Sequence, residues 1–306
     1  MKKVFALTIN YKSDKETKEL LESLLSVTSK DLKLNVIVID NYPRKPIKLE
    51  SKKYEKLGLR VIYNDRNLGF AQGNNKGIEF ALKNGADYVL IINNDTIVDK
   101  SFLTELISIF DTKDSVGIAA PLIYFEKGYE FHKERYKEDE LGKVIWYAGG
   151  EIDWDNVLAK HRGVDEIDIG QYSQVSETEF ASGCAFLISV EVIKNLGMFD
   201  EKYFLYYEDS DLSMRIKRKG YKIYFNPKSL VWHKNASSAG GSGSTLQDYY
   251  ITRNRLLFAL KYAPIRSKIA VLRESMALMF GGRKWQKRAV IDFYSGKLGK
   301  GSYPVT

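Results

Sequence analysis

Two polar segments of the chain contain residues whose types and spacing could do chemistry on a phosphorylated substrate. In the first, the apolar run Tyr88–Ile92 leads directly into Asn93, Asn94 and Asp95. Such a run is typical of a parallel strand covered on both faces, and ligands of parallel sheets collect at the carboxyl ends of the strands. Asp95 supplies the hard oxygen with which Mg²⁺ or Mn²⁺ binds alongside substrate phosphates. The alternative is a turn in which Asp95 caps a following helix.

The second segment, residues 204–215, places Glu208, Asp209 and Asp211 within four residues. Crowded carboxylates cost stability unless cations or shifted pKa values relieve them. Acids at the start of a helix complement the helix dipole, which accounts for Asp211 but not for all three. The two segments together are therefore hard to explain as turns, and the spacing alone does not separate Asp209 from Asp211.

Alternating strands and helices must position these side chains. Strands that alternate with helices pair in parallel through right-handed crossovers. The turn after the first expected strand, residues 10–14, contains no glycine, so the Gly-x-Gly-x-x-Gly signature of dinucleotide-binding oxidoreductases is missing. The sequence therefore argues against hydride transfer. Apolar patterns predict strands at 4–9, 35–40, 59–63, 88–92 and 180–188, and helices at 15–26, 71–84 and 190–195.

In order and spacing, the motifs of the chain resemble those of the family 2 glycosyltransferases of GT-A fold, most closely the rhamnosyltransferase-like branch. The resemblance implies an α/β protein with a Rossmann-like, mostly parallel sheet flanked by helices. The Asp-x-Asp metal motif of the family reads Asn93-Asn94-Asp95 here, a variant that related members also carry and that leaves one charged ligand. The resemblance covers about residues 3 to 260 and rests on the segments Thr8–Tyr11, Val38–Asn41, Asn67–Asn75, Asn93–Asp95, Ala181–Phe186, Gly197–Asp200, Phe204–Arg215 and Tyr249–Arg255.

The resemblance implies a nucleotide-sugar pocket. Asp40 would accept a hydrogen bond from the N3–H of a uracil or thymine ring, unless it only closes a strand-to-turn junction. Asn67 is explained almost as well by helix capping, and Arg253 and Arg255 by solvation on a helix surface. The residues expected to bind the donor are Thr8, Asn10, Asp40, Asn67, Gly69, Gly73, Asn74, Asn94, Arg253 and Arg255.

The resemblance also implies the catalytic roles. Asp95 and His233 would bind Mg²⁺ or Mn²⁺ at the departing diphosphate, although an isolated histidine is more often structural. Asp209 would be the general base of an inverting displacement. Glu208 would orient Asp209, and Asp211 would cap the helix that follows.

Residues 124–178 lose the strand and helix alternation. We interpret them as an irregular insertion on the acceptor side, in which His132 and His161 are solvated loop histidines. The Gly- and Ser-rich run 236–244 is either a linker or, as we favour, a loop that orders over the bound donor. The single cysteine, Cys184, is expected to be a buried thiol and not a nucleophile.

The positive charge of the chain is concentrated at its C-terminal end. The net charge is +8 over 306 residues, but residues 251–306 carry twelve Lys and Arg against two acidic residues, a net of +10, and the remainder carries −2. Apolar residues in this region have helical spacing. A basic amphipathic region is typical of a membrane-surface element, and the alternative is a helical hairpin packed on the core with a solvated basic face. Nucleic acid is not expected, because no binding motif accompanies the charge.

These features predict a catalytic domain at 1–250 and a basic helical appendage at 251–306. The N-terminus has no signal-peptide pattern, and no apolar run approaches the ~20 residues of a membrane span. We therefore expect a cytoplasmic protein, with peripheral contact on the inner face of the plasma membrane through the appendage. The sequence leaves the oligomeric state open, with a homo-oligomer among the options.

The function predicted from the sequence is metal-dependent, inverting transfer of a sugar from a UDP- or dTDP-sugar, with dTDP-rhamnose as one candidate. The acceptor would be a hydroxyl of a cell-surface polysaccharide or lipid-linked glycan. A sugar nucleotidyltransferase would need a Gly-rich basic loop after the first strand, which is missing. A non-catalytic domain that binds glycan or membrane is the other alternative, and the presence of Asp40, Asp95, Asp209 and His233 argues against it.

Overall fold

The computed structural model describes residues 1–27, 31–235 and 244–304 of the chain. Its main feature is a mixed sheet with the strand order β10-β12-β6-β11-β4-β1-β2-β3, in which β5 also pairs with β12 and β7 with β6. The strands of this sheet are β1 (Lys2–Asn10), β2 (Leu32–Asp40), β3 (Arg60–Tyr63), β4 (Tyr88–Ile92), β5 (Thr96–Val98), β6 (Val116–Phe125), β7 (Ile145–Tyr147), β10 (Ser176–Glu177), β11 (Ala185–Ser189) and β12 (Lys222–His233).

The N-terminal half has the predicted α/β arrangement, which is confirmed. Strands β1, β2, β3 and β4 pair in parallel, with β1 between β2 and β4. Helix α1 (Asp14–Leu25) connects β1 to β2 and buries Leu20, Leu21 and Leu24, and α2 (Gly69–Lys83) connects β3 to β4. The 3₁₀ helix η1 (Glu55–Leu57) lies between β2 and β3. Because β1 is flanked by strands whose connections run in opposite directions, the carboxyl ends of these strands are where a sheet of this kind binds its ligands.

The chain then extends the sheet with antiparallel and parallel strands. After α3 (Phe102–Thr112), β6 pairs in parallel with β12, and β11 runs antiparallel to both β4 and β6. Helices α4 (Val190–Leu196) and α5 (Glu208–Arg218) follow β11. The strand predicted for 180–188 begins only at Ala185, because residues 181–184 turn and their backbone N–H groups bind side chains instead of a neighbouring strand.

The insertion at 124–178 is more ordered than the sequence predicted. It contains β7, β10, the 3₁₀ helix η2 (Lys133–Arg135), and a hairpin of β8 (Gly150–Asp153) and β9 (Leu158–His161). His161 lies in β9 and packs against Trp146 and Phe180, and burial lowers its pKa to about 4. The prediction of a solvated loop histidine is therefore wrong for His161, whereas the side chain of His132 is 43% exposed.

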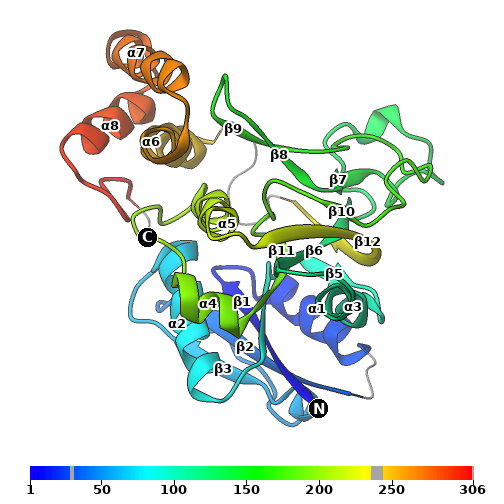
Figure 1. Cartoon of the computed structure of the whole chain (residues 1–306). Coiled ribbons are helices and arrows are strands. Elements are labelled where there is room, and N and C mark those ends of the chain that lie inside the picture. Colours follow the sequence, from blue (N-terminus) through cyan, green and yellow to red (C-terminus); the bar gives the residue numbers. More distant parts are fainter. Residues whose placement is uncertain (28–30, 236–243, 305–306) are drawn as a thin grey trace.

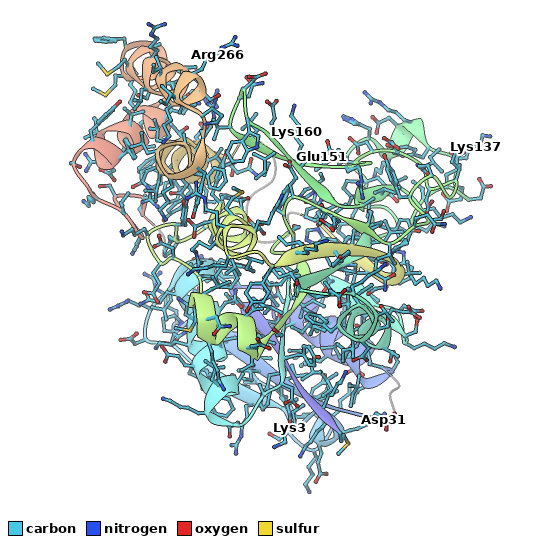
Figure 2. The ribbon with its side chains drawn as sticks, in the orientation of Figure 1. Lys3, Asp31, Lys137, Glu151, Lys160 and Arg266 are labelled. Atoms are coloured by element: carbon cyan, nitrogen blue, oxygen red, sulfur yellow. The ribbon has the colours of Figure 1, made fainter. Side chains whose placement is uncertain are left out.

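Three helices form the C-terminal region and lie together beside α5, away from the β1–β3 edge of the sheet (Figure 1). They are α6 (Thr245–Tyr262), α7 (Ile265–Gly281) and α8 (Lys284–Tyr294). The boundary predicted between residues 250 and 251 falls inside α6, which is continuous across it. Charged side chains such as Lys3, Lys137 and Arg266 point outward from the fold (Figure 2).

Within the described ranges, none of the helices is both long and apolar enough to cross a membrane. The loop predicted to order over the donor, 236–244, lies outside the described residues except for Ser244.

Candidate active site

The turn after β4 carries the first functional side chain and β12 brings the second to it. Residues Val231–His233 of β12 pair antiparallel with β5, so that His233 lies opposite Thr96, and Lys234 N–H donates to the Asp95 carbonyl. This pairing places His233 Nε2 3.2 Å from Asp95 Oδ1. No helix begins at Asp95, because β5 follows it directly. The alternative of a helix cap is therefore wrong.

The Asp95 and His233 pair fits a divalent cation. Two ligands at ~2.1 Å from a metal on adjacent octahedral positions lie about 3 Å apart, close to the observed separation. Both residues are 5% exposed. Burial opposes the charged form of His233, but the neighbouring Cys184 sulfur and Asp95 carboxylate outweigh it and hold its pKa well above the usual range. Because a histidine binds a metal in its neutral form, the cation would have to displace this proton. The described residues contain no cluster of three or more His, Cys, Asp and Glu that could hold a metal, so diphosphate oxygens and water would complete the ligand shell.

Asn94 ties the same turn to the start of α1. Its Nδ2 donates to Ser13 Oγ at 2.6 Å, to Thr17 Oγ1 at 2.8 Å and to the Ser13 carbonyl at 3.3 Å. Thr17 in turn donates to Asn10 Oδ1 at 2.9 Å. Asn94, which was predicted to bind the nucleotide-sugar donor, therefore fixes the position of Asp95 relative to β1 through these hydrogen bonds. An amide suits this position because a carboxylate cannot donate to a carbonyl.

Asp40 and Asn10 lie together at the carboxyl ends of β2 and β1. Asp40 Oδ1 accepts from Asn10 Nδ2 at 3.1 Å and from Tyr42 N–H at 3.2 Å, and Oδ2 accepts from Ile47 N–H at 2.8 Å. A carboxylate oxygen can accept two hydrogen bonds, so Oδ2 keeps capacity for a base N–H. Thr8, on β1, is fully buried, and its Oγ1 has no hydrogen-bond partner among the described residues.

Asp209 is held by the turn that precedes β11. Gly183 N–H donates to Asp209 Oδ2 at 2.9 Å, and Ser210 N–H donates to Oδ1 at 2.7 Å. Cys184, the next residue after Gly183, interacts with His233 and Asp95, and its carbonyl accepts from Asn93 N–H at 2.8 Å. The segment 183–184 therefore connects the candidate base with the candidate metal ligands.

Burial raises the pKa of Asp209, although its backbone hydrogen bonds oppose the shift. Its neighbour Glu208 is buried, and Glu208 Oε2 has no partner among the described residues. Burial and the nearby Asp209 charge raise the pKa of Glu208 well above its usual range. A raised pKa on a carboxyl group in a catalytic cleft is typical of acid and base residues.

Asp211 has a different environment. Its side chain is completely buried and accepts from Arg215 Nε at 2.8 Å, Lys261 Nζ at 2.9 Å and Tyr262 Oη at 2.8 Å. Helix α5 has no side-chain cap at its start. The prediction that Asp211 caps the helix is therefore wrong, because its carboxylate instead joins α5 to α6. The geometry separates Asp211 from Asp209, which the spacing could not do.

The glycines predicted to approach the donor are required for packing. A Cβ at Gly69, where φ is +72°, would lie 2.6 Å from the Phe204 carbonyl oxygen, and a Cβ at Gly73 would lie 2.9 Å from Ile9 Cδ1. Asn67 Oδ1 accepts from Gly69 N–H at 2.8 Å. Gly69 and Gly73 therefore let α2 lie close to β1 and to the loop before α5, and Asn67 shapes the turn that enters α2.

Of the predicted donor residues on α2, Asn74 keeps an unused polar atom. Its Nδ2 donates to the Phe70 carbonyl at 3.1 Å, but its buried Oδ1 has no partner among the described residues.

The contacts of Arg253 and Arg255 hold other parts of the fold together. Arg253 is fully buried and donates to the Tyr203 carbonyl at 3.0 Å. Arg255 donates to the Asn156 carbonyl at 2.8 Å and to Glu274 at 2.8 Å. Arg253 therefore holds the loop that leads into α5, and Arg255 joins α6 to α7 and to the insertion.

Several side chains that shape the site were not singled out from the sequence. Ser13 and Thr17 accept hydrogen bonds from Asn94, and Gly183 N–H donates to Asp209. Trp146 packs against His233 with ring centroids 4.6 Å apart. The motif Ala181–Phe186 contains Gly183 but gave no indication that its N–H would bind a carboxylate. Ser13 could have been found, because it follows the first strand at the edge where Asp95 was expected.

The mostly parallel sheet flanked by helices is that of the GT-A fold of glycosyltransferases. The chain belongs to the glycosyltransferase like family 2, whose model matches residues 4–256.

Comparisons with relatives agree with this family. The chain is 25% identical over 266 residues to the dTDP-rhamnosyl transferase RfbF of Shigella flexneri, covering 84% of this chain and 80% of that protein. It is 23% identical over 252 residues to the low-salt glycan biosynthesis hexosyltransferase Agl10 of Haloferax volcanii, covering 82% and 73%.

The fold is similar to that of a crystal structure of GalNAc-T7 with UDP, GalNAc and Mn²⁺, with a TM-score of 0.58 and 17% identity over 96% of this chain and 58% of that one. The mannosyltransferase PcManGT of Pyrobaculum calidifontis, with GDP-Man and Mn²⁺, gives a TM-score of 0.53 at 14% identity, covering 98% of this chain and 76% of that one.

Proposed function

We propose that the protein is a divalent-metal-dependent, inverting glycosyltransferase that uses a UDP- or dTDP-sugar. The observation that carries the proposal is the 3.2 Å separation of His233 Nε2 and Asp95 Oδ1. Asp209 is bound by Gly183 N–H, in the segment 183–184 next to this pair. Similarity to a dTDP-rhamnosyl transferase supports dTDP-rhamnose as the first donor to test, and the acceptor would be a glycan hydroxyl.

The residues would divide the chemistry as follows. Asp95 and His233 would hold Mg²⁺ or Mn²⁺, which when bound stabilises negative charge on a departing diphosphate. Asp40 would accept the base N3–H through its remaining lone pair. Asp209 would take the proton of the acceptor hydroxyl as that oxygen attacks the anomeric carbon from the face opposite the diphosphate. Its raised pKa brings Asp209 closer to the working pH, which favours proton transfer.

Glu208 would act on Asp209 through charge. Glu208 is buried beside Asp209, and the charge of Asp209 disfavours ionisation of Glu208. A protonated Glu208 would leave Asp209 as the ionised partner, a division of roles that adjacent carboxyl groups commonly adopt. Glu208 would therefore act on the acceptor only through Asp209.

Helix α7 supports a peripheral contact with an anionic bilayer. Its buried residues are Ser267, Val271 and Ser275, and the opposite face exposes apolar side chains, including Ile265 at 75% and Phe280 at 81%. At about 100° per residue these apolar residues share one face, with basic residues on both flanks. The exposed apolar residues are Ile265, Ile269, Met276, Met279 and Phe280, and the flanking basic residues are Arg266, Lys268 and Arg273. The cytoplasmic location stays a prediction.

The function is tested by a thermal-shift screen of nucleotide sugars with and without Mn²⁺, followed by calorimetric titration. A ligand at 100 times its Kd adds about 2.7 kcal/mol of stability, so a true donor should stand out. Asp95→Ala should then lose the gain in UDP or dTDP affinity that Mn²⁺ produces. Asp111→Ala, an exposed acid on α3, serves as the matched control. Metal-enhanced affinity that survives in Asp95→Ala would remove Asp95 from the metal site.

A further inference from the structure

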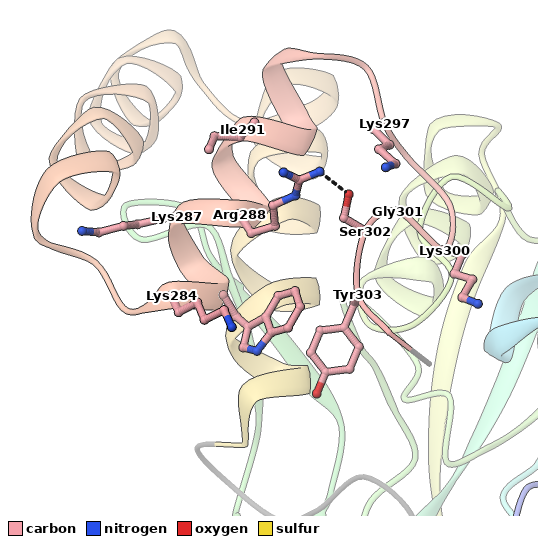
Figure 3. Close-up of a pocket in the computed structure, with 10 residues that line it drawn as sticks. Lys284, Lys287, Arg288, Ile291, Lys297, Lys300, Gly301, Ser302 and Tyr303 are labelled. Atoms are coloured by element: carbon pink, nitrogen blue, oxygen red, sulfur yellow. Dashed lines mark hydrogen bonds between the residues drawn. The ribbon is translucent and has the colours of Figure 1, made fainter. Parts of the chain in front are cut away.

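A basic pocket of about 760 Å³ lies between α8 and the C-terminal segment 297–303 (Figure 3). We call it the α8 pocket. The family motifs and the proposed active site use none of the residues that line it. Five of its lining side chains are cationic and none is acidic; the cationic residues are Lys284, Lys287, Arg288, Lys297 and Lys300.

Most of this positive charge has no counter-charge. Among the described residues, the four lysines form no ion pair with a carboxylate. Arg288 Nε lies 3.1 Å from Asp292 Oδ1. Asp292 is 1% exposed and also accepts from Tyr249 Oη at 2.5 Å and Ser302 N–H at 2.9 Å. The carboxylate that pairs with Arg288 is therefore buried and already engaged by other donors.

The wall that carries Lys297 and Lys300 is fixed to the rest of the fold. Gly299 N–H donates to the Lys202 carbonyl at 2.8 Å, and the Lys300 carbonyl accepts from Tyr250 Oη at 2.9 Å. At Gly301, where φ is +62°, a Cβ would lie 1.9 Å from Tyr249 Oη. Only glycine lets the segment pass this close to α6, so the lysines are presented by a built surface.

The pocket also has an aromatic and apolar side. The Trp285 and Tyr303 rings lie 4.7 Å apart between centroids, and Tyr303 Oη lies 2.8 Å from Thr245 Oγ1 at the start of α6. Ile291 lines the pocket and is 45% exposed. Figure 3 shows Arg288 directed at Ser302, with Lys297 and Lys300 on the facing segment. Cations therefore meet an apolar surface within one concavity.

We propose that the α8 pocket is a binding site for a phosphate or diphosphate group carried on an organic moiety. Lysine ammonium groups bind phosphate oxygens through charge-assisted hydrogen bonds, and the Trp285 and Ile291 surface suits the carbon atoms next to the phosphate. The source of the group is either a soluble phosphate compound or the headgroup of an anionic lipid. The site is separate from the donor site, so binding to it does not depend on the proposed sugar transfer.

Direct binding without any nucleotide sugar tests the proposal. One arm titrates the full chain with inorganic pyrophosphate, and the other with vesicles of phosphatidylcholine containing phosphatidylglycerol, against pure phosphatidylcholine. The test variant is Lys284→Gln/Lys297→Gln/Lys300→Gln. The control is Lys33→Gln/Lys52→Gln/Lys83→Gln, which removes equal charge from exposed positions in the N-terminal half. Each lysine near an anionic lipid surface contributes about fivefold to binding, so the test variant should bind the vesicles at least tenfold more weakly than the control. A larger loss in the test variant than in the control is likewise expected with pyrophosphate.

The two arms identify the source. A loss confined to the pyrophosphate arm assigns a soluble phosphate compound, and a loss confined to the vesicle arm assigns a lipid headgroup; either result supports the site. The proposal is overturned if neither probe binds the wild-type chain, or if the test and control variants lose affinity equally. Donor hydrolysis should stay at the wild-type rate in both variants, which separates failure of the pocket from failure of the transferase.

Discussion

Asp211→Asn should lower the stability of the protein while leaving its chemistry in place. The Asp211 carboxylate is completely buried and lies 2.8 Å from Arg215 Nε and 2.9 Å from Lys261 Nζ. It also accepts hydrogen bonds from the Tyr203 and Tyr262 hydroxyls at 3.2 and 2.8 Å. Removing its charge leaves Arg215 without its anion, whereas Lys261 keeps Asp200 Oδ2 at 2.6 Å.

The size of the effect follows from burial. Breaking a buried ion pair by removing one partner costs about 3–5 kcal/mol. The Arg215 and Lys261 side chains are 24% and 29% exposed, so water screens part of the loss and we expect about 3 kcal/mol. With about 2.1 cal/mol/K of unfolding entropy per residue over 306 residues, this corresponds to a fall of about 5 °C in Tm.

The matched variant is Asp209→Asn, two residues away on the same helix. It gives up part of the hydrogen bonding from Gly183 and Ser210, but it also removes a carboxylate that burial disfavours. Its Tm should therefore change less than that of Asp211→Asn. Sugar transfer should fall by about 10² to 10⁴-fold, the usual contribution of a general base, with donor affinity close to that of the wild type.

Scanning calorimetry gives the Tm of each variant, and turnover measured at a temperature below both Tm values separates the two effects. The reasoning would be refuted if Asp211→Asn kept the wild-type Tm and lost turnover while Asp209→Asn remained active. The roles of the two carboxylates would then be exchanged.

Three further predictions concern Glu208, Asn94 and α7. Burial raises the pKa of Glu208 in the folded chain, so its contribution to stability is fully present below the unfolded pKa and is lost as pH rises through the folded pKa. The Tm of Glu208→Gln relative to that of the wild type should therefore increase from pH 5 to pH 8. A Tm difference that stays constant over this range would contradict the burial argument. The Asn94→Asp side chain cannot donate to the Ser13 carbonyl, so the free energy of unfolding should fall by about 1–3 kcal/mol, measured by denaturant unfolding. Calorimetric titration should show no gain in Mn²⁺-dependent nucleotide affinity. A tighter metal site would contradict the structural role assigned to Asn94. Ile265→Ser/Phe280→Ser on α7 should abolish sedimentation with anionic vesicles, whereas the control Ile169→Ser/Tyr129→Ser, at exposed positions in the insertion, should not. Equal vesicle binding by the two double variants, or a dimer in solution that only the α7 variant loses, would assign the apolar face of α7 to a second copy of the chain.

Local patterns in the sequence were sufficient for the N-terminal half of the fold. Residues 89–92 of the apolar run are buried on β4, and Leu20, Leu21 and Leu24 are buried on α1, because period and hydrophobicity are local properties. The position of Asp95 at the carboxyl end of a central strand followed from the same pattern. The order of the family motifs predicted the family and the fold.

Contacts between distant segments were decided only by the tertiary structure. Antiparallel pairing of β12 with β5 brings His233 to Asp95, and Gly183 N–H fixes Asp209, although no local pattern encodes either contact. The same limit explains Arg253, whose charge suggested a phosphate ligand but whose side chain is buried against the carbonyls of Lys202 and Tyr203. The +10 charge of residues 251–306 was evident in the sequence, but only the packing of segment 297–303 against α6 gathers part of it into the α8 pocket. Charge and hydrophobicity belong to the residues themselves, whereas the partners of each residue depend on how the elements pack.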